Sequence, residues 1–455
     1  MEEIEEVFDV IELLEGKQFG KVREVLSEMN NVDIAELFDD VSKENAIRLF
    51  RLLNKDDAAD VFSYMEPDAQ QQILEAMSDK ELREVLDDMF LDDTVDMLGE
   101  MPANLVSRLL KNTSVDTRVY INQLLNYPDD SAGSIMTIEF VDLKADMTVE
   151  EAFAKIKETA IDKETVYTCY VTDRFRILEG VVTVHQLLIA DRSAIISDLM
   201  DTHAIIAHTH DKREDVAMNF SKYGLLAMPV VDGENRLVGI VTVDDAMDVL
   251  EKEVTEDIET MAAIVHADKP YLRQSVWQIW KNRIPWLLLL MISATFTGKI
   301  ISSFEDALAV FPALTAFIPM LMDTGGNAGG QASATIVRGL ALDEIRMEDI
   351  FRIWWKEFRV SLMMGVTLAA VNFLKILVVD NMILGSNISL EIGAVICVTL
   401  FTAVVIAKLV GSTLPIVAKK IGFDPAVMAS PFITTIVDAL ALLVYFAVAS
   451  AVLGI

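Results

Sequence analysis

Five long apolar stretches fill the C-terminal part of this 455-residue chain and constrain its fold more than any other feature. They cover about residues 284–303, 307–337, 358–380, 389–418 and 425–455. A helix needs roughly 20 apolar residues to cross the hydrocarbon core of a bilayer. The sequence therefore predicts five transmembrane helices over residues 281–455. Pro312, Pro319 and Pro415 predict kinks or breaks in the second and fourth of them.

The charge of the chain divides at Pro270. Of the 38 Lys and Arg residues, 25 lie up to this point and 13 beyond it, whereas the 71 Asp and Glu residues divide into 59 and 12. The part up to Pro270 thus carries a net charge of −34 and the rest +1. Binding to nucleic acid needs a basic surface, so this composition excludes it. A large acidic surface attracts cations instead.

Loop charges predict the orientation in the membrane. The longest uncharged run before Pro270, Gly180–Ala190, is too short to cross a bilayer, so the acidic part is expected to be soluble. Basic residues flank the apolar stretches on one side only, at Lys281 and Arg283, in the 338–359 connection, and at Lys419 and Lys420. Basic loops stay in the cytoplasm. We therefore expect a multi-pass protein of the cytoplasmic (inner) membrane, with the N-terminus in the cytoplasm and the C-terminus outside.

Two repeat patterns organise the acidic part. In residues 1–130, short amphipathic segments such as AELFDDV from Ala35 and ADVFSYM from Ala59 recur at nearly constant intervals. One short helix and a turn per unit predict a small superhelix, because no such helix can bury its apolar face alone. Two copies of a βαββα pattern follow, predicted over 131–197 and 198–250, and they resemble a pair of CBS domains. Their second strands begin at Gly180 and Gly239.

The segment PMLMDTGGNAGGQ, Pro319 to Gln331, places polar groups inside a membrane stretch. Its glycines form two overlapping GxxxG patterns, which let helix backbones approach closely. A helix-packing seam would explain the glycines alone. Asp323, Asn327 and Gln331 are not explained by a seam, because lipid cannot solvate them. We therefore favour a pore lining.

The last apolar stretch contains a carboxylate, Asp438, about 14 residues from its start. At ~1.5 Å per residue this is near the middle of the bilayer, where a lone carboxylate costs at least ~2.5–3 kcal/mol. Thr434 and Thr435 precede it on nearly the same helix face. The alternative is a buried pair with Lys299, Lys375 or Lys408, lysines that we expect to extend to the membrane surface. We assign Asp438 to a cation instead.

The two parts of the chain are joined by an acidic segment, VDDAMDVLEKEVTEDIETMAAIV, residues 243–265. Between Asp244 and Glu259 it holds eight acids and one base, Lys252. Acids three or four positions apart on a helix repel one another, and a shared divalent cation removes that repulsion. The segment predicts an acidic connecting helix, assigned to residues 251–280, that links cation binding to the membrane domain. A solvated acidic linker is the alternative.

Taken in order, these features resemble the MgtE magnesium channel family over essentially the whole chain. They are the acidic helical domain, SAGSIMT from Ser131, two CBS domains, the acidic helix, GGNAGGQ and DPAVMASPF. The resemblance implies a homodimer with a pore on its two-fold axis. It further implies a hydrated Mg2+ held by Asp438 with Asn327, Thr434, Thr435 and Asp424. Regulatory Mg2+, which closes the pore, is implied at Asp245, Asp248, Glu253, Glu256 and Asp257, with Asp92 and Asp96 from the helical domain.

Mg2+ suits these residues chemically, because it prefers oxygen ligands and keeps several of its waters. The five histidines all precede the membrane part, and His208 with His210 fits a surface pair better than a zinc site. Gly239, Thr242 and Asp245 also resemble the nucleotide-binding pattern of some CBS domains, although the first copy has Gln186 in place of the acid. ATP is therefore a second candidate ligand.

Other classes of function fit less well. An intramembrane metalloprotease needs two His and a Glu around zinc, and no His follows His266. No P-loop is present, so no ATP-driven pump and no enzyme is predicted. The two cysteines, Cys169 and Cys397, form no metal or disulfide pattern. A coupled secondary transporter of Mg2+ or another divalent cation such as Co2+ remains the alternative to a channel, and selectivity over Co2+, Mn2+ or Ca2+ stays open.

Overall fold

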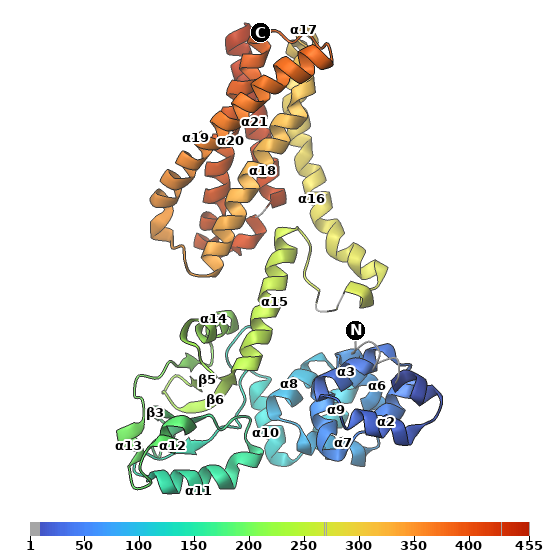
Figure 1. The fold of residues 1–455 in the computed structure, drawn as a ribbon, viewed down its shortest axis with the longest axis vertical. Helices are drawn as coiled ribbons and strands as arrows, with labels where there is room; N and C mark the ends of the chain where they lie inside the picture. Colours follow the sequence, from blue (N-terminus) through green and yellow to red (C-terminus); the bar gives the residue numbers. More distant parts are fainter. Residues whose placement is uncertain (1–9, 268, 270, 429, 455) are drawn as a thin grey trace. The chain divides into compact units, whose positions relative to one another are not determined.

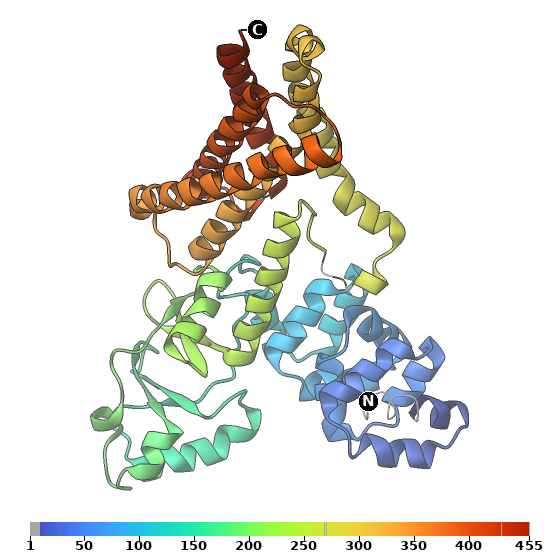
Figure 2. The same cartoon turned by 45° about the horizontal axis from the view of Figure 1, so that its top comes forward.

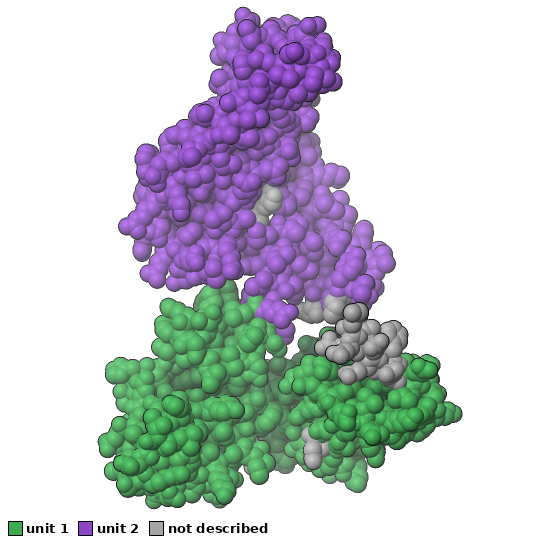
Figure 3. All heavy atoms as spheres, viewed as in Figure 1, with its two compact units in different colours: residues 1–250 green, residues 251–455 purple. Residues whose placement is uncertain are grey.

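The chain forms two compact units in a computed structural model that describes residues 10–267, 269, 271–428 and 430–454. Residues 1–250 make the first unit and residues 251–455 the second, coloured separately in Figure 3. The first unit contains the helical array and two small sheets, and the second contains the long helices (Figures 1 and 2). Residues 1–9 lie outside the described residues, and so does Ala429, which belongs to the segment DPAVMASPF.

The helical array consists of short helices at a regular spacing, as the repeat predicts. They are α2 (Phe19–Leu26), α3 (Asn31–Asp40), α4 (Lys43–Phe50), α5 (Lys55–Ser63), α6 (Pro67–Ala76), α7 (Asp79–Asp88), α8 (Leu91–Glu100), α9 (Ala103–Asn112) and α10 (Val115–Leu124). Helices two apart in the chain contact each other, such as α3 with α5 and α5 with α7. This alternation makes the predicted superhelix.

The array is held by capped helix ends and an aromatic core. Asn30 accepts a hydrogen bond from the Val32 amide, and Ser78 and Glu81 form a reciprocal capping box at α7. Phe38, Phe50 and Phe62 recur with the helix repeat and stack edge to face, with ring centroids 6.3 and 5.8 Å apart. Such aromatic pairs add to the stability gained from burial alone. The repeat in the sequence thus becomes a continuous core.

The next segment forms two equivalent three-stranded sheets, which confirms the tandem βαββα pattern. The first copy is β1 (Asp142–Leu143), α11 (Val149–Thr159), β2 (Thr168–Thr172), β3 (Leu178–Thr183) and α12 (Val184–Ile189). The second, after the short α13 (Ile196–Leu199), is β4 (Ala207–His208), α14 (Arg213–Tyr223), β5 (Ala227–Val231), β6 (Leu237–Thr242) and α15 (Val243–Met261). In each sheet the first two strands are parallel and the last two antiparallel.

The two copies exchange their opening segments. Thr137, near the start of the first copy, bridges to Ile240 of the second, and Asp201, near the start of the second, bridges to Val181 of the first. A methyl group at Gly239 would lie 2.8 Å from the Thr137 carbonyl oxygen, and one at Gly180 2.8 Å from that of Asp201. Both glycines are therefore required because another backbone crosses them closely.

The acidic connecting helix has different bounds from those predicted. Helix α15 starts at Val243, directly after β6, and ends at Met261. A short 3-10 turn, η2 (Tyr271–Arg273), precedes the first long helix. The range 251–280 is therefore not one helix, because Ala263 adopts a left-handed backbone conformation with φ of 58° just after α15 ends. The other predicted domain bounds stay predictions.

The long helices follow the predicted apolar stretches. They are α16 (Val276–Ser303), α18 (Ala313–Ala341) after the short α17 (Glu305–Val310), α19 (Ile350–Lys375) with the π-helical end η4 (Ile376–Ile383), α20 (Leu390–Lys420), and α21 (Ser430–Leu453) after η5 (Pro425–Met428). Among the described residues, four of them, all but α18, are long and apolar enough to cross a membrane. Helix α18 carries the polar glycine segment, so the count of five stays a prediction.

Of the three prolines at which the sequence predicts a kink or a break, one interrupts its apolar stretch and two lie inside continuous helices. Pro312 does interrupt the second stretch, since α18 starts directly after it. Helices α18 and α20, however, continue through Pro319 and Pro415. An interior proline costs a helix ~3 kcal/mol, and the extensive burial of both helices against their neighbours compensates for that loss.

Candidate functional site

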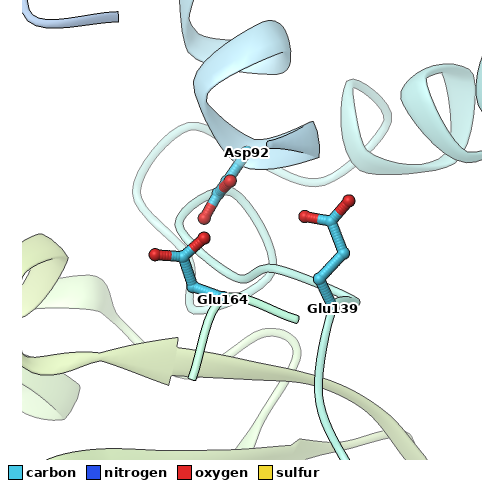
Figure 4. Close-up of side chains that lie close together, drawn as sticks. All are labelled: Asp92, Glu139 and Glu164. Carbon is cyan, nitrogen blue, oxygen red and sulfur yellow. The ribbon is translucent and has the colours of Figure 1, made fainter. Parts of the chain in front are cut away.

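Three carboxylates converge in the first unit (Figure 4). Asp92, Glu139 and Glu164 each place one oxygen within 4.8 Å of the others. Among the described residues, this is the group whose geometry could hold a metal ion. Three converging carboxylates with no basic side chain among them form a site for a hard divalent cation. We call Asp92, Glu139 and Glu164 the acidic cluster.

Each side chain of the acidic cluster comes from a different element. Asp92 lies in the first turn of α8, where acids are favoured by the helix dipole. Glu139 follows the strand bridge at Thr137 and accepts a hydrogen bond from the Leu91 amide at the start of α8, with N and Oε2 3.1 Å apart. Glu164 lies just before β2, and its amide donates to the Glu139 carbonyl at 2.9 Å. The helical domain and the first CBS copy thus build the cluster together.

Further acidic residues lie around the acidic cluster and increase the negative charge of this region. Asp93 and Asp96 come from α8, and Asp244 and Asp245 from the first turn of α15. The negative charge of Asp245 contributes to the raised pKa of Asp92, and the negative charge of Asp96 contributes to the raised pKa of Asp245. The structure therefore brings together the predicted Asp92, Asp96 and Asp245. It adds four acids that the sequence analysis did not select, namely Asp93, Glu139, Glu164 and Asp244.

Burial and mutual repulsion disfavour the charged forms of these acids. Burial, followed by the charge of Asp244, raises the pKa of Glu164 to about 8, and burial raises the pKa of Asp245 to about 7. Burial and the charge of Asp245 hold the pKa of Asp92 well above its usual range. Oε2 of Glu164 is buried without a hydrogen-bond partner in the described structure. Buried acids in this state need either protons or a cation.

The cluster predicts a pH-dependent stability. A carboxyl whose pKa is raised by folding stabilises the folded protein when protonated, and this contribution is lost as pH rises from about 4 to about 8. Without divalent cations, the melting temperature of the full-length protein should therefore fall between pH 5.5 and pH 8. Added Mg2+ should raise it more at pH 8, where the ligands are ionised. A larger Mg2+ effect at pH 5.5 would contradict a metal site here.

The remaining predicted regulatory acids lie along α15. Asp248 and Glu256 are exposed, whereas Glu253 and Asp257 are half-buried. Burial, followed by the charges of Asp424, Glu253 and Glu256, raises the pKa of Asp257 to about 6. Within the second unit, Asp424 is thus a neighbour of these connecting-helix acids. Its Oδ1 also accepts a hydrogen bond from the Ala426 amide at 2.8 Å.

The nucleotide-binding pattern has a defined local geometry. Thr242 at the end of β6 donates a hydrogen bond to Asp245, with the two oxygens 2.6 Å apart. In the first copy, Thr183 and Gln186 occupy the equivalent positions and form a capping box. Asp245 therefore both contacts the residue that precedes α15 and faces the acidic cluster.

In the second unit, the glycines of α18 form a packing seam with α21. A methyl group at Gly325 would lie 3.1 Å from Cγ1 of Val437, and one at Gly326 2.9 Å from Cγ2 of Thr434. One at Gly329 would lie 2.8 Å from Cγ2 of Ile433. These contacts account for Gly325, Gly326 and Gly329, three of the four glycines in the two GxxxG patterns.

The polar residues of the same segment lie on another, exposed face of α18. Asp323, Asn327 and Gln331 recur at every fourth position and are all exposed in the single chain. Asn327 Nδ2 donates to Asp323 Oδ1 at 3.0 Å. From the sequence, a packing seam and a polar pore lining are alternatives; in the structure, α18 has a seam on one face and exposed polar side chains on another. We call Asp323, Asn327 and Gln331 the polar stripe.

Asp438 on α21 is half-buried, and its charged neighbour is Asp323 of the polar stripe. The hydroxyls of Thr434 and Thr435, one turn earlier, both donate to the Pro431 carbonyl at 2.9 and 3.1 Å. Their remaining lone pairs are available to a ligand. Two carboxylates and neutral oxygens near one another in a membrane helix bundle match the needs of a hydrated cation.

Two of the lysines that could neutralise Asp438 pair with other acids. Lys375 Nζ lies 3.1 Å from Asp380 Oδ2, and Lys408 Nζ lies 3.6 Å from Glu357 Oε2. The expectation that Lys408 extends to the membrane surface is wrong, because its side chain is only 8% exposed. Its buried acid partner holds it inside the helix bundle.

The glycine seam predicts a steric effect at Gly329. Gly329→Leu should force α18 away from Ile433 and the Ala407 carbonyl, which lies 3.2 Å from an added methyl carbon. Overpacking of this kind costs ~1–3 kcal/mol or more, so the melting temperature and the yield of monodisperse protein should fall. Asn327→Ala, on the exposed face, should leave both unchanged and alter only ion flux or selectivity. Equal loss of stability in both variants would show that the polar stripe is also part of the seam.

Comparison with known families supports the same division of the chain. The MgtE family, described as divalent cation transporters, matches residues 318–448. The MgtE intracellular N domain matches residues 29–130, and the CBS domain matches 132–193 and 196–252. The acidic cluster joins the second and third of these regions, and the polar stripe lies in the first.

Individual relatives and solved structures agree with these matches. The magnesium transporter MgtE of Thermus thermophilus is 36% identical over 363 residues, 79% of each chain, and that of Bacillus subtilis is 35% identical over 364 residues, 79% of this chain and 78% of its own. A solved soluble part of a magnesium transporter is 31% identical with a TM-score of 0.51, and the match covers 55% of this chain and 99% of that one. The cytosolic domain of the Mg2+ channel MgtE in complex with ATP is 36% identical with a TM-score of 0.50, and that match covers 53% and 99%. From the helical array to the glycine seam, this chain belongs to the MgtE family of divalent cation transporters.

Proposed function

We propose that this protein transports Mg2+ across the cytoplasmic membrane through a pore on the axis of a homodimer. The polar stripe of α18 is the observation that carries the proposal. The side chains of Asp323, Asn327 and Gln331 are exposed on α18, and lipid could not satisfy such groups on the transmembrane helix that we propose here. A second copy facing the stripe across a water-filled path would satisfy them. The relatives named as magnesium transporters support Mg2+ as the ion.

The proposed pore site binds the ion through its water shell. Mg2+ gives up its waters reluctantly, so a site for rapid transport should contact the waters rather than the bare ion. Asp438 supplies the charge, with Asn327, Thr434 and Thr435 as neutral oxygen groups near it. The family resemblance also assigns Asp424 to the pore, but its proximity to Asp257 suits it better to the cytoplasmic mouth and to regulation. This family consists of transporters, so no catalytic step is involved.

We further propose that Mg2+ in the cytoplasm closes the pore by binding to the acidic domains. Without it, the negative charge of the acidic cluster pushes the helical domain and the CBS copies apart. A cation bound between Asp92 of α8 and the carboxylates of Glu139 and Glu164 attracts all three and so replaces that repulsion. Helix α15 follows in the chain, before the first membrane helix, and carries further negative charges. They include those of Asp248, Glu253, Glu256 and Asp257. The orientation with acidic domains inside follows from the basic loops.

Uptake into liposomes tests transport and feedback together. Purified protein would be reconstituted with a fluorescent Mg2+ indicator inside, and uptake would be measured at several Mg2+ concentrations on the side of the cytoplasmic domains. We expect uptake that falls as this concentration reaches the millimolar range, and no fall with KCl of equal ionic strength. Uptake that needs a counter-ion gradient would favour the coupled transporter. Liposomes that take up no Mg2+ would reject the function.

ATP is a second proposed ligand of the CBS pair. A structural relative was solved with ATP, and Thr242 and Asp245 follow β6 with their side chains in contact. Binding of a fluorescent ATP analogue to the full-length protein would test this. Asp245→Asn keeps the side-chain shape and should weaken ATP binding if Asp245 accepts a ribose hydrogen bond. Unchanged ATP affinity in that variant would show that Asp245 does not bind ATP, and its proposed role would then be limited to the cation site.

A further inference from the structure

A buried ion pair joins two membrane helices away from the polar stripe. Lys408 of α20 and Glu357 of α19 have side chains only 8% and 15% exposed, with Nζ and Oε2 3.6 Å apart. Oε2 of Glu357 forms no hydrogen bond in the described structure. Neither residue belongs to the glycine segment or to the acidic cluster. A full charge in this environment is retained only when it is paired.

The position of Lys408 along α20 sets the depth of the pair. Lys420, at the end of the helix, lies more than three turns further along, or about 18 Å at ~1.5 Å per residue. The lysine side chain cannot cover that length. Ala407, the preceding residue, places its carbonyl against Gly329 of the glycine seam, and Gly411 lies against the backbone of the same glycine. Lys408 therefore lies at the depth of the glycine segment.

The remaining contacts of α19 show how Glu357 is held beside Lys408. One turn toward the start of α19, Trp354 Nε1 donates to Thr413 Oγ1 at 2.8 Å. Two turns beyond Glu357, Gly365 packs against the ring of Phe401. These contacts on both sides fix α19 along α20. The face of α20 that carries Lys408 is thus covered by α19, while Ala407 and Gly411 meet α18.

A cation transporter gains nothing from a positive charge at this depth. An ammonium in a poorly solvated membrane domain repels cations over several ångströms, and a divalent ion twice as strongly as a monovalent one. A neutral pair produces only a short-range dipole. We propose that Glu357 is a charge-compensating positioning residue for transport, which holds the Lys408 ammonium against α19 and cancels its charge toward the cation path. This inference rests on the proposed transport function.

Two single variants and their combination separate charge from structure. Glu357→Gln keeps the shape and leaves the ammonium uncompensated, whereas Lys408→Met leaves the carboxylate. Both should lower the melting temperature. Mg2+ uptake per folded protein should fall about tenfold in Glu357→Gln and far less in Lys408→Met. The double variant E357Q/K408M, which is neutral and of similar volume, should recover uptake to within about twofold of the parent.

A merely structural pair gives a different pattern. In that case E357Q and K408M would lose stability but show equal uptake per folded protein, and this result would overturn the proposal. Failure of the double variant to recover uptake would overturn it as well. If E357Q does not fold, the exchanged pair E357K/K408E keeps neutrality, and loss of uptake in that folded variant counts against charge compensation. Absence of uptake by the parent itself would instead reject the transport function, and this inference with it.

Discussion

Asp438→Asn is expected to abolish or strongly reduce Mg2+ uptake while leaving a folded protein. The substitution keeps the size of the side chain and removes the charge that the pore site requires. Asp438 is half-buried in the first half of α21, close to Asp323. A carboxylate at such a depth costs at least ~2.5 kcal/mol. The melting temperature of the variant should therefore stay the same or rise, while uptake in the liposome assay falls by at least about tenfold, the ratio that ~1.4 kcal/mol represents.

A matched control separates this effect from a general loss of charge. Glu391→Gln removes one exposed carboxylate at the start of α20, outside the polar stripe and the glycine seam. It should transport Mg2+ like the parent. Undiminished uptake by Asp438→Asn would exclude Asp438 from the ion path. Loss of both stability and uptake would instead point to a structural role.

Replacing Glu139 and Glu164 together with Gln should abolish much of the Mg2+ feedback. The variant retains the shape of both side chains but leaves the acidic cluster with Asp92 as its one carboxylate. Because each charged ligand contributes to the affinity, we expect the Mg2+ concentration that closes the pore to rise at least about tenfold. Uptake at low Mg2+ should be unchanged, since the pore site is intact. Limited proteolysis across residues 124–142, between α10 and β1, should show the same shift in Mg2+ dependence.

The control for this variant removes the same number of negative charges at positions outside the acidic cluster. Glu36→Gln with Asp116→Asn removes two exposed acids of the helical array outside the acidic cluster. If general charge repulsion governs the gate, both double variants should shift the closing concentration alike. If the acidic cluster binds the ion, only the Glu139 and Glu164 variant should do so. An unchanged closing concentration in both would place the feedback elsewhere, with the acids of α15 as the next candidates.

Local patterns in the sequence were sufficient for much of the fold. The repeat of short amphipathic segments predicted the helical array because each helix must share its apolar face with neighbours, and Phe38, Phe50 and Phe62 follow that repeat. The alternating strands and Gly180 with Gly239 predicted the paired CBS copies. The end of the acidic helix was missed, because no Gly or Pro stands between Met261 and Pro270 to mark it, whereas the backbone turns at Ala263.

The candidate sites were only partly visible in the sequence. Asp92, Asp96 and Asp245 were selected through a family resemblance, and the structure places them near one another. Glu139 and Glu164 carry no motif of their own. Their only signal was position, just after SAGSIMT and just before the strand that starts at Thr168. Lys408 was misjudged because its partner, Glu357, lies far from it in the chain, on the preceding long helix.

The amino-acid order alone was enough to establish the division into an acidic and an apolar part, the repeat of the helices, and the placement of carboxylates and glycines in apolar stretches. These features follow from composition and short-range periodicity, which act within a few residues. Three features became known only from the folded chain: which carboxylates converge, which face of α18 is a seam and which is polar, and the pairing of each CBS copy with the opening segment of the other. Contacts of this kind join residues tens of positions apart, and their energies depend on burial and distance, which no local pattern encodes.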